Sequence, residues 1–213
     1  TLLEENTDAL QKGCINLVQH IRNLEQFGVP LTIAINRFNT DTDAELEIIK
    51  KYSRDLGVDA IECRHWSEGS KGTVELAEKV VHLTDSEHTQ FKMLYDDELS
   101  LWEKVQRIAQ KIYGADDIIA NKKIREQFAQ IEKNGFGNYP VCIAKTQYSF
   151  STDPNLYGAP KGHVVPIREV RLAAGAEFVV VVCGAIMTMP GLPRKPAAEN
   201  ISINSEGQIE GLF

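Results

Sequence analysis

The chain has 213 residues, 43% of them hydrophobic, so it can bury a core and form one large or two small domains. Its formal net charge of -7 and its pI near 5.3 argue against an electrostatic grip on nucleic acid or an anionic membrane. The four cysteines include no C-x-x-C pair, and the longest apolar run, residues 178–183, is too short to span a bilayer. We therefore expect a cytoplasmic protein without a zinc site or a disulfide framework.

Helices and strands are expected to alternate in residues 1–84. Apolar residues at helical spacing alternate there with short β-branched runs, which is the order typical of a parallel α/β sheet. Thr42 and Glu45 have the spacing of a capping box, so one helix has a visible start. In chain order we expect a helix through about Phe27, a strand at 30–35, a helix from Thr42, a strand at 58–62 and a helix over 73–83.

The rest of the chain changes character twice. Residues 86–133 are predicted to be mainly helical, interrupted by a turn at 113–117. From Gly135 onward, glycine and proline separate short β-branched runs, which predicts a smaller β-rich domain. We therefore divide the chain into an α/β region with its helical segment, 1–118, and a small domain, 119–213. The strands expected in the second are 140–144, 163–170, 177–183 and 201–204.

Each of the first two predicted strands is followed by a loop that carries one large aromatic residue, Phe38 or Trp66. Because the carboxyl ends of parallel strands meet at one rim of a sheet, the two loops should lie side by side. An aromatic residue at such a place often only caps the hydrophobic core. The pair favours instead a clamp for a planar heterocycle, in which each stacked face contributes roughly 1–3 kcal/mol.

Five segments, in order over nearly the whole chain, carry a family resemblance. They are AINRFNTDTDAELE (34–47), CRHWSEGSKG (63–72), QKIYGADDI (110–118), GFGNYPVCIAKTQYSFSTDP (135–154) and MTMPGLPRKPAAENI (187–201). Together they resemble the carboxyl-terminal part of formate–tetrahydrofolate ligase, whose members typically finish with the GLF found at 211–213. The resemblance implies a P-loop-type parallel α/β sheet portion, followed by a helical segment and a smaller β-rich α+β domain.

The resemblance also implies a reaction and its ligands. In this family MgATP phosphorylates formate to formyl phosphate, and tetrahydrofolate attacks the formyl carbon to give 10-formyltetrahydrofolate. The residues that match Phe38 and Trp66 sandwich the pterin of the folate. ATP with Mg²⁺, tetrahydrofolate and formate are thus the expected ligands, and a monovalent cation is left open.

The phosphate-binding loop of the family lies in its amino-terminal portion, and this chain contains no G-x-x-x-x-G-K-[ST]. We therefore expect a fragment that is inactive alone and works with the amino-terminal portion of the same enzyme, within a homo-oligomer. The alternative is a non-catalytic folate- or nucleotide-binding module, or an assembly module.

Three further residues are candidate contacts. Asn36 ends the first strand, and its amide would recognise adenine, by analogy with P-loop proteins, or would bond its own turn. Arg64 and Lys71 would hold an anion, either the glutamate tail of folate or nucleotide phosphates. The other interpretation is a solvated loop in which Lys71 pairs with Glu68 or Glu75.

The sequence identifies no catalytic residue and no metal ligand. Asp41 and Asp43 are expected to be helix-start charges. The segments 145–149 and 187–193 each follow a predicted strand, and we expect them to support the active-site cleft or the subunit interface.

Overall fold

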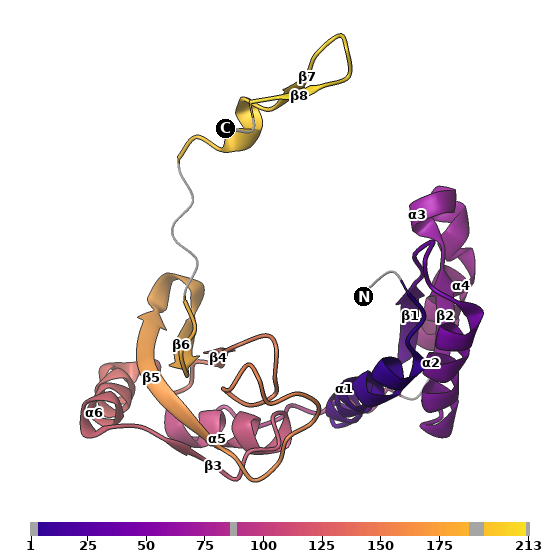
Figure 1. The fold of residues 1–213 in the computed structure, drawn as a ribbon. Helices are drawn as coiled ribbons and strands as arrows, with labels where there is room; N and C mark the ends of the chain where they lie inside the picture. Colours follow the sequence, from indigo (N-terminus) through magenta and orange to yellow (C-terminus); the bar gives the residue numbers. More distant parts are fainter. Residues whose placement is uncertain (1–3, 86–88, 188–193, 212–213) are drawn as a thin grey trace.

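The computed structural model describes residues 4–85, 89–187 and 194–211. Figure 1 shows two groups of elements, the first drawn in indigo and purple and the second in magenta and orange, with a short hairpin beyond them. The first group consists of α1 (Thr7–Glu25), β1 (Thr32–Asn36), α2 (Asp43–Asp55), β2 (Asp59–Cys63), α3 (His65–Glu68), the 3-10 helix η1 (Gly69–Thr73) and α4 (Val74–Asp85).

The strands β1 and β2 are parallel, as the sequence predicts. Thr32 lies opposite Asp59 at the start of the pair, and Asn36 lies opposite Cys63 at its end. The two strands therefore stop at the same level, and the loops that follow them begin side by side.

The predicted capping box at the start of α2 is confirmed. The Thr42 hydroxyl accepts a hydrogen bond from the Glu45 backbone at 3.3 Å, and the Glu45 carboxylate accepts one from the Thr42 backbone at 3.1 Å. The same carboxylate accepts a bond from the backbone N–H of Asn6, the N-cap of α1. These bonds hold the pKa of Glu45 below its ordinary value, chiefly through Asn6. The starts of α1 and α2 are thus tied to one carboxylate.

Residues 89–100, predicted as helical, form no helix. Their backbone is instead bonded to the turn that follows α1: Gln90 N–H donates to the carbonyl of Gly28, and Lys92 N–H to that of Phe27. Gly28 has a φ of 66°, and a Cβ there would lie only 2.1 Å from the Gln90 oxygen, so this close approach requires glycine.

The second group is a mixed four-stranded sheet covered by helices. Its strand order is β3-β5-β6-β4, with β5 and β6 antiparallel and the two outer pairs parallel. The predicted domain division after residue 118 falls within β3 and stays a prediction. The elements are α5 (Leu101–Lys111), β3 (Asp117–Ile119), α6 (Lys122–Ile131), the π-helix η2 (Glu132–Phe136), β4 (Val141–Ala144), β5 (Val164–Ala173), the 3-10 helix η3 (Ala174–Ala176) and β6 (Phe178–Cys183).

The main hydrophobic core lies in this second group. Leu101 and Val105 of α5 and Phe128 of α6 pack there with Val179 and Val181 of β6, and all five side chains are buried. Lys104 is also fully buried, and its ammonium donates to the carbonyls of Gly137 and Tyr139. The sheet and its two helices therefore form one packed unit.

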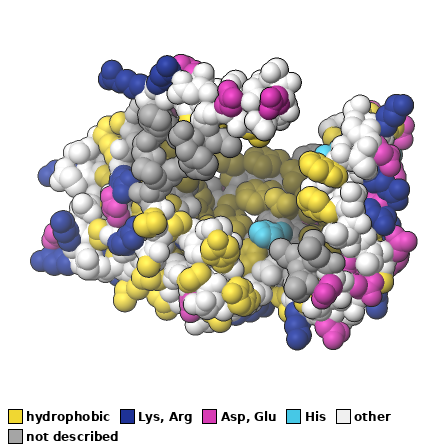
Figure 2. Space-filling view, turned by 45° about the horizontal axis from the view of Figure 1, so that its top comes forward, with side chains coloured by type: hydrophobic (Ala, Val, Ile, Leu, Met, Phe, Trp, Pro, Cys, Tyr) yellow, Lys and Arg dark blue, Asp and Glu magenta, His cyan; other side chains and the backbone are white. Residues whose placement is uncertain are grey.

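Helix α1 connects the two groups. The Asn23 amide donates to the carbonyl of Ile112 at 2.9 Å, and the Gln26 amide donates to that of Lys111 at 3.1 Å. Figure 2 shows that hydrophobic side chains gather in a hollow at the centre of the molecule on this face.

Beyond β6, residues 194–211 contain the 3-10 helix η4 (Ala197–Glu199) and a small antiparallel hairpin of β7 (Ser202–Ile203) and β8 (Ile209–Glu210). The hairpin stands away from the four-stranded sheet in Figure 1. No helix in the described ranges has the length and apolar character needed to cross a membrane.

Candidate functional site

The two predicted loops meet at the carboxyl rim of the β1–β2 pair. The backbone N–H of Arg37, the first residue after β1, donates to the carbonyl of Cys63, the last residue of β2, at 3.1 Å. The second loop closes on itself, because Arg64 N–H donates to the carbonyl of Gly72 at 2.9 Å. A Cβ at Gly72 would lie 2.5 Å from the Arg64 carbonyl carbon, so only glycine permits this closure.

Both predicted clamp aromatics are exposed. Phe38 is 52% and Trp66 is 72% accessible to solvent, and neither contacts another ring in the part of the chain that the structure describes. Asp41 fixes the turn at Phe38, since its carboxylate accepts from the Phe38 N–H at 2.7 Å. This exposure argues against the alternative in which the two rings cap the core.

Glu62 joins the two loops. One of its carboxylate oxygens accepts from Arg37 at 2.8 Å and from the Nε of Arg64 at 2.6 Å, and Arg37 also bonds Asp43 at 2.9 Å. The two arginines, Arg37 first, hold the pKa of Glu62 below its ordinary value. The Glu62 side chain is only 17% exposed, so these bonds are partly shielded from water.

Arg64 borders a small hollow of about 250 Å³ between the loops. Because Glu62 engages its Nε, the two terminal amino groups of Arg64 are left without a partner in the described part of the chain. Phe38, Asn39 and Ser67 also line the hollow, together with Arg37 and Glu68. A guanidinium in this arrangement can form a two-pronged bond to a carboxylate or a phosphate.

Lys71 lies on η1 and does not line this hollow. It is exposed and has no ion-pair or hydrogen-bond partner among the described residues, so the alternative pairing with Glu68 or Glu75 is not found there. The two predicted anion contacts therefore differ: Arg64 is anchored, and Lys71 is free.

Asn36 faces a different hollow, of about 610 Å³, bordered by α1 and α2. Its amide makes no side-chain hydrogen bond within the described ranges, so the alternative bond to its own turn is not found there. Asp41 also borders this hollow, and both Asp41 and Asp43 are engaged within their own loop and helix start. No group of three metal-ligating side chains occurs in the described residues.

Comparison with known proteins identifies the family. A family model described as formate--tetrahydrofolate ligase matches residues 1–213. The formate--tetrahydrofolate ligase of Roseobacter denitrificans is 60% identical over 209 residues, covering 98% of this chain and 38% of the relative. The chain belongs to the formate–tetrahydrofolate ligase family. The enzyme of that name from Sinorhizobium medicae is 58% identical over 212 residues, covering 100% of this chain and 37% of the relative.

The chain thus spans about 38% of the length of the curated formate–tetrahydrofolate ligases that it matches. The predicted placement of this segment at the carboxyl-terminal end of a ligase stays a prediction.

Arg37 and Glu62 were not among the site residues predicted from the sequence. The signal was present, because Arg37 follows the first strand directly and Glu62 and Arg64 flank the end of the second. In the register of the sheet Glu62 lies opposite Ile35, two residues before Arg37. Assigning a register to the two predicted parallel strands would have brought these charges together.

Of the two later segments, 145–149 lines a further hollow, between α1 and the segment that follows β4. In the segment 187–193, Met187 is 93% exposed, and residues 188–193 lie outside the described residues.

Proposed function

We propose that this chain holds tetrahydrofolate in an ATP-dependent formate–tetrahydrofolate ligase. In that reaction MgATP phosphorylates formate to formyl phosphate, and the folate amine displaces phosphate from the formyl carbon to give 10-formyltetrahydrofolate. The observation that carries the proposal is the pair of exposed rings, Phe38 and Trp66, on adjacent loops at the carboxyl rim of parallel strands. Open α/β sheets bind ligands at this rim, and two rings suit a flat pterin.

The other loop residues have roles in this proposal. Arg64 binds a carboxylate of the folate glutamate tail through its two terminal amino groups. Asn36, which borders the separate hollow beside α2, contacts adenine through its amide. The folate amine is a weak nucleophile and formyl phosphate is short-lived, so holding the amine in place contributes directly to the rate.

The phosphates and Mg²⁺ are assigned in this proposal to the rest of the ligase, with any monovalent cation. A sheet of two parallel strands is small, since parallel sheets are usually larger and covered on both faces. Ala34 and Asn36 on β1 are exposed here. Further strands from an amino-terminal portion would complete a P-loop-type sheet and bring a phosphate-binding loop to the same rim. We place the assembled ligase in the cytoplasm as a homo-oligomer.

The clamp is tested by kinetics of a ligase that contains this chain. Trp66→Ala should raise the KM for tetrahydrofolate about tenfold, because stacking on one face is lost, and should change the KM for ATP and formate much less. Tyr157→Ala is the matched control, since Tyr157 is 75% exposed and borders neither loop. An unchanged folate KM in both Trp66→Ala and Phe38→Ala would reject the clamp.

The alternative function is a non-catalytic folate- or nucleotide-binding module, or an assembly module. It is favoured by the absence of a G-x-x-x-x-G-K-[ST] sequence from these 213 residues. The mass of the protein as synthesised in its host separates the two. A longer polypeptide with a phosphate-binding loop supports the ligase, and a polypeptide of this length supports the module.

A further inference from the structure

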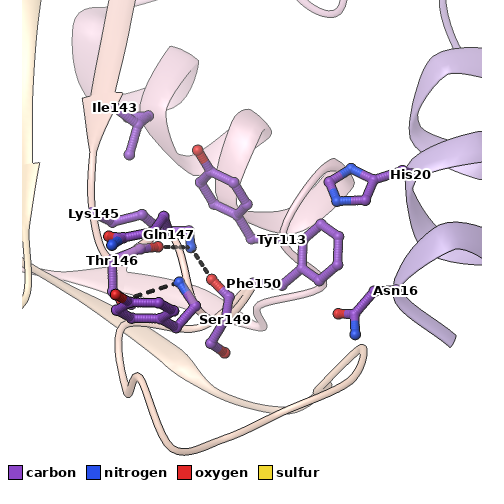
Figure 3. A pocket seen from close by; sticks show the side chains of 10 residues that line it. Asn16, His20, Tyr113, Ile143, Lys145, Thr146, Gln147, Ser149 and Phe150 are labelled. Carbon is purple, nitrogen blue, oxygen red and sulfur yellow. Dashed lines mark hydrogen bonds between the residues drawn. The ribbon is translucent and has the colours of Figure 1, made fainter. Parts of the chain in front are cut away.

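A hollow of about 280 Å³ lies between α1 and the segment that follows β4. Asn16 and His20 reach it from α1, and Tyr113 reaches it from the turn after α5 (Figure 3). The remaining lining residues all come from 143–150, which includes the segment 145–149 expected to support the active-site cleft or the subunit interface. None of its lining residues belongs to the loops that carry Phe38 and Trp66, so it is a separate site.

Aromatic rings make up much of the wall. The ring centroids of His20 and Phe150 are 4.9 Å apart, with their planes tilted by 48°. Phe150 is buried, whereas Tyr148 is 66% exposed at the rim. Tyr113 contributes a further ring next to Lys145 (Figure 3). A flat ligand would therefore meet ring surfaces contributed by α1, by the turn after α5 and by the segment after β4.

A positive charge that has no counter-ion among the described residues lies in the same wall. The Lys145 ammonium donates to the backbone carbonyls of Thr146, Ser149 and Ser151, which uses all three of its N–H groups. It also lies 4.8 Å from the centre of the Tyr113 ring. No carboxylate pairs with it in the described part of the chain, and burial lowers its pKa. Lys145 therefore shapes the segment and provides a positive field, but has no donor left for a ligand.

Some of the polar groups that line the hollow have no partner among the described residues. Neither the Gln147 amide nor the Tyr113 hydroxyl forms a side-chain hydrogen bond among the described residues. Burial raises the pKa of Tyr113 to about 12, so its hydroxyl keeps its proton and can donate. The Asn16 amide nitrogen makes only a long bond of 3.4 Å to Gly13, which leaves its oxygen available. These groups offer both donors and acceptors to the edge of a ring.

We propose that this hollow binds a planar, electron-rich nitrogen heterocycle of the purine or pterin type. The exposed ring of Tyr148 supplies stacking surface above the buried Phe150, the amides and the Tyr113 hydroxyl bond the edge of the ligand, and the Lys145 charge favours an electron-rich π face. The described lining contains no Asp or Glu that would repel such a ligand. The volume suits one ring system, so a ribose, phosphates or a glutamate tail would extend outside. The proposal does not depend on the clamp at Phe38 and Trp66.

Calorimetric titration of the purified protein tests the site with two probes, adenosine and 6-methylpterin. All variants carry Trp66→Ala as background, so that the proposed clamp does not contribute to pterin binding. In that background, Tyr148→Ala should lower the affinity for the probe that binds about tenfold, and Gln147→Ala should lower it as well. Both side chains are exposed, so the variants should keep the melting temperature of their parent. Tyr157→Ala is the matched control and should bind as its parent does.

The probe that binds more strongly identifies the class of the natural ligand. Stronger binding of adenosine assigns the hollow to a nucleotide, and stronger binding of the pterin assigns it to a folate. The proposal is overturned if neither probe binds at millimolar concentration, or if the bound probe is insensitive to both Tyr148→Ala and Gln147→Ala. A failure here leaves the clamp intact, because the clamp is tested by folate kinetics and not by these titrations.

Discussion

Arg64 and Lys71 carry the same charge on one loop but differ in what surrounds them. Arg64 is held by Glu62 at 2.6 Å and borders the hollow next to Phe38. Lys71 is exposed and has no partner in the described ranges. An anchored guanidinium loses less side-chain freedom on binding than a free lysine. We therefore assign the anionic tail of the ligand to Arg64 in preference to Lys71.

This assignment predicts unequal effects of two matched substitutions. In a ligase that contains this chain, Arg64→Gln should raise the KM for polyglutamylated folate about tenfold at low salt, because charge-assisted bonds are lost. Lys71→Gln should change it less than about twofold, as is usual for an exposed charge. High salt should shrink the Arg64 effect. Equal effects of the two substitutions, or an Arg64 effect that salt leaves unchanged, would contradict the assignment.

At the scale of elements, the sequence predicted what depends on local signals. The parallel β1–β2 pair and the capping box of α2 follow from strand and helix patterns within about 35 residues of chain. The three-residue strand β3 was missed, because it is too short for a pattern and pairs with β5, which begins at Val164. The segment 145–149 was singled out from the sequence, but the opposite wall of its hollow was not, since Asn16 and His20 of α1 come near it only in the folded chain.

Glu62 links two elements, because its carboxylate, near the end of β2, binds Arg37 in the loop after β1. Its pKa is lowered in the folded chain from an ordinary value of 4.5, so it stabilises the fold fully above that pH. The stabilisation is lost as the pH falls through the lower folded pKa. Glu62→Gln should therefore lower the free energy of unfolding at pH 7 by about 1 kcal/mol. This figure is modest because the ion pairs are partly exposed to water.

The measurement is urea unfolding of wild type and Glu62→Gln across acid pH. The difference in free energy of unfolding should be constant near neutrality and shrink toward zero in acid. Glu68→Gln is the control, because Glu68 borders the same hollow without an ion pair in the described part of the chain. A difference that is independent of pH would mean that Glu62 acts through packing and not through charge.

On the scale of the whole molecule, the two groups of elements differ in how complete they are. The four-stranded sheet has α5 and α6 packed into a buried core. The β1–β2 pair has only two strands, and α4 beside it has no buried residue and exposes Val74, Val80 and Val81. The candidate folate loops stand on this less complete group. In the proposed function, this exposed apolar surface would be covered by further strands and helices from the rest of a ligase.

The isolated chain should accordingly bind folate weakly and turn over no ATP in response to formate. Phosphoryl transfer depends on backbone N–H groups and cations that hold the phosphates, and the 213 residues contain no G-x-x-x-x-G-K-[ST] sequence. Phosphate release is measured with formate and tetrahydrofolate present, using a ligase that contains this chain as the positive control. Folate affinity is measured on the chain alone, where Trp66→Ala should reduce it further. Formate-dependent ATP turnover by the chain alone would contradict the assignment of the phosphates to the rest of the ligase, because the phosphate site would then lie within these residues.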